Sequence, residues 1–258
     1  MSADKPLNAR QTAILKLIEK NGVATIDELV EAFDVTPQTL RRDLNLLADY
    51  NLIQRFHGGA TSITSTENLS YQDRQIRNLE EKEAIAREIA LHVPDHSSMF
   101  INIGTTTETI ARALMNHKGL QVVTNNLHVA SMMSQKEDFR VIVTSGEVRA
   151  RDGGIVGEAT MDFVQQFRLD FGIIGISAID EDGALLDYDY REVRVAQAII
   201  QQSRHVFLAA DHSKFGRRAM VRLGSITQAN MFFTDQRPSE EIETMMKNHD
   251  VRLHICTP

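Results

Sequence analysis

The fold of the N-terminal part of the chain is decided by the stretch Thr36-Pro37-Gln38-Thr39-Leu40-Arg41-Arg42-Asp43-Leu44. Thr36 can accept a hydrogen bond from the first turn of a helix. Proline is well suited to the next position, because the N–H that it lacks has no helical partner there. The stretch therefore predicts a helix that begins at Pro37. Leu44 and Leu47 follow Leu40 at helical spacing, so the three leucines should share one buried face.

The remaining side chains of this helix suit DNA. The residues with hydrogen-bonding groups on or beside the open face are Thr36, Gln38, Thr39, Arg41, Arg42 and Asn45. Arginine pairs with phosphate oxygens and guanine, glutamine and asparagine pair with adenine, and threonine contacts the backbone or a thymine methyl group. The pattern fits insertion into a DNA major groove, although an ordinary amphipathic surface helix would also show it.

The preceding residues favour the DNA-binding interpretation. Apolar residues between 13 and 18 recur at helical spacing, and Asn21-Gly22 ends that helix. Thr25-Ile26-Asp27-Glu28 has the spacing of a capping box and opens a second helix. Asp34-Val35 leaves room only for a tight turn before the third helix. This order is the layout of a helix-turn-helix whose third helix reads DNA.

A wing and a linker are predicted after the third helix. Residues 52–56 alternate like a strand and end at His57-Gly58-Gly59, so a wing would lay Arg55 and His57 on the DNA backbone. A polar Ser/Thr run follows from Thr61. We therefore expect a winged helix-turn-helix DNA-binding domain over 1–60, a linker over 61–78 and a second domain over 79–258.

Composition limits the classes of protein that the chain can belong to. The chain has 258 residues and a net charge of −7, and residues 1–59 carry seven basic and eight acidic residues. A general polyanion binder would show a basic excess, so DNA contact must come from a local cluster. The single Cys256 excludes an internal disulfide framework, and no stretch is apolar enough for a signal peptide or a membrane span. We expect a cytoplasmic protein that does not contact membranes.

Short apolar runs alternate with helical stretches in the second domain. Apolar strands are predicted at 99–103, 121–124, 140–144, 171–176 and 205–210, with helices at 106–115, 127–133, 157–167 and 191–202 between them. Such alternation predicts a mostly parallel sheet covered on both faces, with ligands bound at the carboxyl ends of its strands.

Polar residues follow several of these strands. Gly104-Thr105-Thr106-Thr107 opens a helix, where backbone N–H groups and the helix dipole favour a phosphate, although a simple threonine cap is the alternative. Thr124 and Asn125 could meet the hydroxyls of a polyol, or form an Asx turn. Lys214 could meet a phosphate as a point charge, or be a solvated loop lysine.

Together these segments resemble the DeoR family of bacterial repressors. The resemblance rests on the 36–44 stretch, on Arg55-Phe56-His57-Gly58-Gly59-Ala60, on Thr124-Asn125-Asn126 and on Asp211-His212-Ser213-Lys214-Phe215-Gly216. It covers nearly the whole chain. It implies a sugar-phosphate-sensing α/β effector domain related in fold to ribose-5-phosphate isomerase, behind a winged helix-turn-helix. Many relatives carry Asp at Asn102 and Gly at Ser145.

The resemblance also implies how the chain would function. It implies a repressor of glycerol and glycerol 3-phosphate metabolism genes that leaves its operator DNA when a phosphorylated polyol, glycerol 3-phosphate, binds. The phosphate would lie on Gly104–Thr107 opposite Lys214, and the hydroxyls would meet Thr124, Asn125 and the segment Asp152-Gly153-Gly154. Readers of palindromic sites usually pair, so a homodimer or homotetramer is expected.

No catalytic role or cofactor is expected. The isomerase relatives carry an acidic run where this chain reads Gly175-Ile176-Ser177-Ala178, so no carboxylate base for proton abstraction is evident there. A sugar-phosphate isomerase-like enzyme is the alternative, and a protein-recruiting adaptor is a third possibility. The spacing of the nine histidines along the sequence is not that of a zinc enzyme, so we expect none to be a metal ligand.

Overall fold

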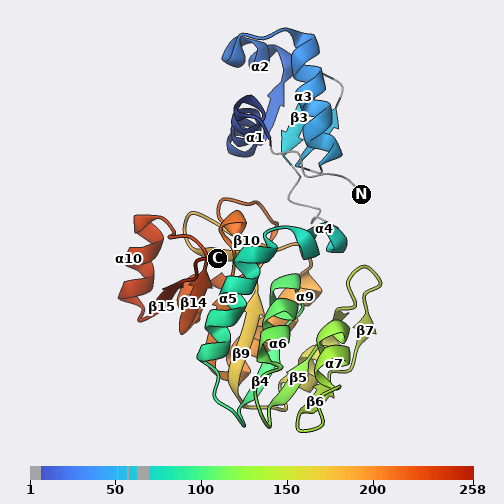
Figure 1. The fold of residues 1–258 in the computed structure, drawn as a ribbon, viewed down its shortest axis with the longest axis vertical. Helices are drawn as coiled ribbons and strands as arrows, with labels where there is room; N and C mark the ends of the chain where they lie inside the picture. Colours follow the sequence, from blue (N-terminus) through green and yellow to red (C-terminus); the bar gives the residue numbers. More distant parts are fainter. Residues whose placement is uncertain (1–6, 51, 57, 63–69) are drawn as a thin grey trace. The chain divides into compact units, whose positions relative to one another are not determined.

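The computed structural model describes residues 7–50, 52–56, 58–62 and 70–258 (Figure 1). The chain divides into two compact units, Met1–Leu69 and Ser70–Pro258. In the described residues, no helix is both long enough and apolar enough to cross a bilayer.

The first unit is a winged helix-turn-helix, as predicted. Its elements are α1 (Ala9–Asn21), β1 (Val23–Thr25), α2 (Ile26–Phe33), α3 (Pro37–Asp49), β2 (Ile53–Phe56) and β3 (Gly59–Ser62). The strands form an antiparallel sheet in the order β1-β3-β2. Both caps predicted from the sequence are present, because Thr25 and Glu28 form a capping box and Thr36 accepts from the Thr39 N–H at 3.3 Å.

The three leucines of α3 form the centre of this unit. Leu40, Leu44 and Leu47 are fully buried and pack with α1 and α2. Asp43 is also buried on α3, where it accepts hydrogen bonds from Arg10 Nε at 2.7 Å and Gln11 Nε2 at 2.8 Å. Because a buried carboxylate needs such partners, Asp43 fixes α3 against α1.

The second unit is built on a parallel sheet of seven strands in the order β15-β14-β12-β9-β4-β5-β6. The strands are β4 (Ser98–Ile101), β5 (Gln121–Thr124), β6 (Arg140–Val143), β9 (Leu169–Gly175), β12 (Ser203–Ala209), β14 (Met231–Thr234) and β15 (Arg252–Ile255). All neighbouring pairs are parallel, so the predicted α/β architecture is confirmed.

Helices cover both faces of this sheet (Figure 1). Those of one face are α5 (Leu79–Leu91), α6 (Thr105–Leu114) and α7 (Leu127–Met133), and those of the other are α8 (Glu158–Val164), α9 (Tyr190–Gln202) and α10 (Glu240–Asn248). Strand residues alternate between the two cores: Phe100 packs with α8 and α9, whereas Met99 and Ile101 pack with α5 and α6. This alternation is expected of a strand buried on both sides.

Smaller elements lie around the sheet. They are α4 (Tyr71–Ile76), the hairpin β7 (Glu147–Val148) with β8 (Ile155–Val156), the antiparallel sheet of β10 (Ala178–Ile179), β11 (Ala184–Asp187) and β13 (Val221–Ser225), and the short helices η1 (His212–Lys214) and η2 (Ile226–Gln228). Helix α4 falls inside the range expected to be a linker, 61–78. It belongs to the second unit, because its side chains bond to residues of that unit.

Candidate DNA-reading and effector sites

The reading face of α3 is open. Gln38, Arg41, Arg42 and Asn45 are exposed, while the leucines of the same helix are buried. Thr36 is exposed at the helix start, and its hydroxyl lies 3.0 Å from the hydroxyl of Thr39. The four long polar side chains therefore form one hydrogen-bonding surface. Their contact with DNA stays a prediction.

The wing reaches this surface through Arg55 on β2, whose Nη1 donates to Asn45 Oδ1. His57, the other residue predicted to contact the DNA backbone, lies outside the described residues. The close packing of the wing requires a glycine at position 59, because a Cβ there would lie 2.4 Å from the backbone oxygen of Ala24. The structure thus brings Asn45 and Arg55 together, which the sequence did not indicate.

The threonine turn opens α6 at the carboxyl end of β4. Gly104 precedes the helix with φ 145°, a conformation that favours glycine, and no side chain caps the helix. The first N–H groups of such a helix have no partner inside it, so they can meet an anion. The hydroxyl of Thr107 is already used, because it lies 2.7 Å from the carbonyls of both Asn102 and Gly104.

Helix α4 covers this turn. Thr105, Thr106 and Thr107 are 7%, 6% and 0% exposed. The Thr105 hydroxyl donates to the Arg74 carbonyl at 3.2 Å, and Tyr71 Oη donates to Glu108 at 2.8 Å. Helix α4 therefore contributes to the burial of the first turn of α6.

Positive charge gathers beside the turn. Lys82 of α5 is 2% exposed, and its Nζ donates to the Arg74 carbonyl, the same acceptor that Thr105 uses. Burial lowers the pKa of Lys82 to about 8, and burial likewise lowers the pKa of Lys214 to about 8, despite the nearby charge of Asp211. The lysines are thus poorly compensated cations, which a phosphate would stabilise.

Asp152 is enclosed by arginines. Arg149 donates to both of its carboxylate oxygens at 2.8 Å, and Arg74 lies 3.5 Å away. Burial opposes its charge, but the bonds from Arg149 outweigh this effect and lower the pKa of Asp152. Arg149 also reaches Asp189 at 3.1 Å and Glu192 at 2.7 Å. Asp152 therefore positions the arginine side chains that surround it.

The glycines after Asp152 allow close packing. A Cβ on Gly154 would lie 2.7 Å from Ile103 Cδ1, and Gly153, at φ 66°, lies against His128. The last residue of β5, Thr124, and the residue after it, Asn125, differ in their bonding. Thr124 donates its hydroxyl to the Ile101 carbonyl at 2.7 Å, whereas Oδ1 of Asn125 is buried without a partner among the described residues.

Further buried polar atoms lack a partner in the described part of the chain, and most lie at the same sheet edge. Those at or beside the carboxyl ends of the strands are Arg74 Nε, Asn102 Oδ1, Asn125 Oδ1, Thr144 Oγ1 and Thr234 Oγ1. Buried polar groups need a partner, which a hydroxylated ligand or water can supply. Asn102, one of the two departures from the family pattern, is in this set. The other, Ser145, donates to the Ala159 carbonyl at 3.1 Å.

Sequence reasoning missed several charged residues of this edge. Lys82, Arg74, Arg149 and Glu192 come from helices or loops without a motif, so only the fold brings them together. Asp187 is a further example: it accepts from Ser177 Oγ at 3.0 Å, and burial raises its pKa. A carboxyl group thus lies beside the strand end where none was evident from the sequence.

The chain also has a cavity of about 680 Å³ beside η1. The residues that line it include three carboxylates, those of Asp180, Glu181 and Glu241, and one guanidinium group, that of Arg237. His212 also lines it. This acidic excess disfavours a phosphate dianion. The cavity is therefore a poorer place for the predicted effector than the strand edge.

Comparison with known proteins identifies both units. Residues 10–66 match the DeoR-like helix-turn-helix domain, and residues 77–236 match the DeoR C terminal sensor domain. The glycerol-3-phosphate regulon repressor of Escherichia coli (strain K12) is 53% identical over 247 residues, which are 96% of this chain and 98% of that protein. The HTH-type transcriptional repressor CsqR of the same organism is 38% identical over 95% of this chain and 94% of that protein.

Among solved structures, ribose 5 phosphate isomerase A from Neisseria gonorrhoeae matches 52% of each chain with 15% identity and a TM-score of 0.39. The similar curated proteins are named as repressors, and the chain is a regulator rather than an enzyme. Because both family domains are matched in order, and because a curated relative shares more than half of the aligned residues, the chain belongs to the DeoR family of transcriptional regulators.

Proposed function

We propose that the chain is a sequence-specific repressor of glycerol and glycerol 3-phosphate metabolism genes, and that glycerol 3-phosphate releases it from operator DNA. The names of its relatives support the gene set. Residues 1–60 would bind DNA through α3 and the wing, and the second unit would bind the effector. As a reader of palindromic sites, the protein would act as a homodimer or homotetramer.

The effector proposal rests on the positive charge around the start of α6. An uncapped helix N-terminus, the ammonium group of Lys82 and that of Lys214 all favour a dianion. The proposed phosphate contacts are the N–H groups of Gly104–Thr107, with the two lysines. Asn125 would meet a polyol hydroxyl through its unpartnered oxygen. Thr107, Thr124 and Asp152 would shape the site through their existing bonds.

Helix α4 would couple the effector to DNA release. It is the first element of the second unit, so it follows the DNA-binding unit directly in the chain. It is held over the phosphate turn by Arg74 and Tyr71. An effector that displaces these contacts would change the position of α4, which is the element of the second unit nearest to residues 1–60 along the chain. Coupling of about 1–3 kcal/mol is typical, which corresponds to a 5- to 150-fold change in affinity.

Two variants test this division of labour. Arg42→Ala should weaken operator binding and leave the affinity for glycerol 3-phosphate unchanged, because Arg42 is exposed on the reading face. Lys214→Met should weaken binding of glycerol 3-phosphate and leave operator affinity unchanged in its absence. Fluorescence anisotropy with labelled operator DNA and calorimetry with the effector measure the two affinities. Equal losses of both affinities in either variant would refute the proposal.

A further inference from the structure

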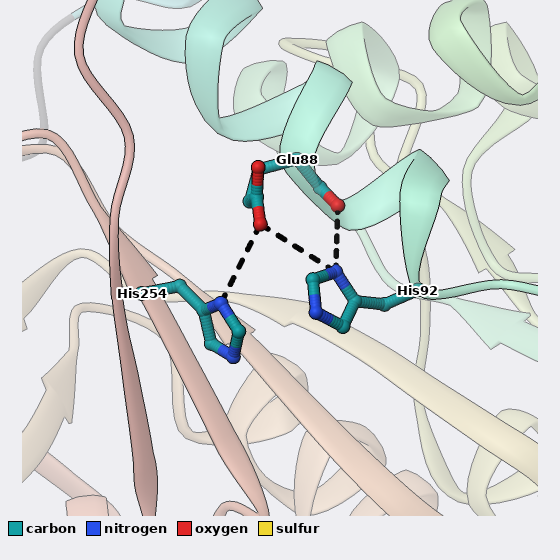
Figure 2. A group of neighbouring side chains, drawn as sticks. All are labelled: Glu88, His92 and His254. Carbon is teal, nitrogen blue, oxygen red and sulfur yellow. Dashed lines mark hydrogen bonds and ion pairs between the residues drawn. The ribbon is translucent and has the colours of Figure 1, made fainter.

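A second cluster of polar side chains lies away from the effector edge, between the last turns of α5 and the edge strand β15 (Figure 2). Glu88 lies in the last turn of α5, His92 is the residue that follows this helix, and His254 comes from β15. Nδ1 of His92 is 3.8 Å from Glu88 Oε1, and Nδ1 of His254 is 3.5 Å from the same oxygen. All three side chains are half-buried.

The two imidazole rings converge on this one carboxylate oxygen. Their centroids are 4.5 Å apart, and the His254 ring stacks on Phe233 at 4.8 Å. The stacking and the packing against His92 fix the direction of the His254 ring. The cluster is therefore ordered by its surroundings and not only by contacts within it.

We propose that Glu88, His92 and His254 form a binding site for a divalent transition metal ion of the zinc class. The ligand atoms would be Nδ1 of each histidine and a carboxylate oxygen of Glu88. All of these atoms lie within 4.8 Å of one another. Ligand atoms at about 2.1 Å from a tetrahedral zinc ion lie about 3.4 Å from each other, so the distances of 3.5 and 3.8 Å from the histidine nitrogens to Glu88 Oε1 are already close to those of a zinc site.

The chemistry of the donors selects the class of metal. Two imidazole nitrogens and one carboxylate oxygen suit zinc and neighbouring transition metals, whereas magnesium and calcium prefer oxygen ligands alone. Without a metal, Nδ1 of His92 faces the Glu88 carbonyl at 2.9 Å, which requires a proton on that nitrogen. Metal binding at Nδ1 would require the His92 ring to turn from this carbonyl and to carry its proton on Nε2 instead, and it would leave the fourth coordination position to solvent.

A bound metal would join α5 to the edge of the sheet. Strand β15 pairs with β14 on one side only, so its outer edge has no neighbouring strand in the described sheet. A metal held by His254 would fix β15 to the helix that also carries Lys82. Because the unfolded chain lacks the assembled site, binding should stabilise the folded protein. This inference does not depend on the identity of the effector.

The test uses the full chain without a histidine tag, after treatment with a chelator. Zinc is titrated in competition with a chromophoric chelator, and thermal unfolding is measured with and without zinc. We expect one tight site per chain and a higher Tm with zinc. His254→Ala and Glu88→Gln should each lower zinc affinity by at least about 100-fold and abolish the rise in Tm.

His249→Ala is the matched control. Nδ1 of His249 faces the carbonyl of Met245 at 2.9 Å, the same helix-end contact that His92 makes, and His249 is not part of the Glu88, His92 and His254 cluster. It should bind zinc like the unmodified chain. The proposal is overturned if the unmodified chain binds no zinc, or if His254→Ala and Glu88→Gln bind it as tightly as His249→Ala does.

Discussion

Raising the pH from 7 to 9 should weaken effector binding through two lysines, the buried Lys82 and the half-buried Lys214. Lys82 and Lys214 each have a pKa lowered to about 8 by burial, and they lie beside the turn proposed to hold the phosphate. The phosphate is a dianion throughout this range, since its second pKa is near 6. The change in affinity therefore reports the charge of the protein.

The magnitude follows from the fraction of charged lysine. A lysine with a pKa of about 8 is about nine-tenths protonated at pH 7 and about one-tenth protonated at pH 9. Affinity scales with the fraction of protein in the binding-competent form, so each lysine that must be charged weakens binding about tenfold. Affinity is thus nearly complete at pH 7 and is lost as the pH rises through 8.

Calorimetric titration of glycerol 3-phosphate at intervals from pH 7 to 9 measures this effect. Lys214→Met should bind more weakly at pH 7 and show a shallower pH profile, because one titrating group is gone. A flat profile for the unmodified protein, or an identical slope for Lys214→Met, would refute the placement of the phosphate beside these lysines.

Three further predictions concern coupling and stability. Asp43→Asn should lower the free energy of unfolding by about 1–3 kcal/mol in urea denaturation, because the buried Asp43 carboxylate loses its charge-assisted hydrogen bond from the half-buried Arg10, whereas the exposed Asp49→Asn should change it little. Gly59→Ala should cost about 1–3 kcal/mol in the same assay, because its Cβ would meet a backbone oxygen of β1. Tyr71→Phe should reduce the effect of glycerol 3-phosphate on operator affinity in anisotropy titrations, whereas the exposed Tyr190→Phe should not; equal coupling in both variants would count against a role for α4.

Local patterns were sufficient to predict the first unit. The spacing of Leu40, Leu44 and Leu47 and the caps at Thr25 and Thr36 depend on neighbours along the chain, and the structure has them where they were expected. The ion pair of Asp43 could not be predicted in this way, because its partners come from α1.

The second unit was predicted in outline. The alternation of strands and helices indicated the parallel sheet, but β14 and β15 were not among the predicted strands. The sequence also could not show which hydroxyl groups at the strand ends are available to a ligand, because the Thr107 and Thr124 hydroxyls bond to backbone carbonyls in the fold. Lys82 could not be predicted as a site residue, because it comes from a helix without a motif.

The histidine cluster illustrates the same limit. The expectation that no histidine binds metal considered only spacing along the sequence. Glu88 and His92 are four residues apart, but His254 joins them through the pairing of β15 with β14. A ligand set that combines a helix with a distant strand has no local signature.

The most direct measurement is the affinity of the protein for labelled palindromic operator DNA, with and without glycerol 3-phosphate, with unphosphorylated glycerol as the control. Glycerol 3-phosphate should lower the affinity 5- to 150-fold, the range of typical allosteric coupling, and glycerol should not. An operator affinity that is the same with and without glycerol 3-phosphate would contradict the proposed function.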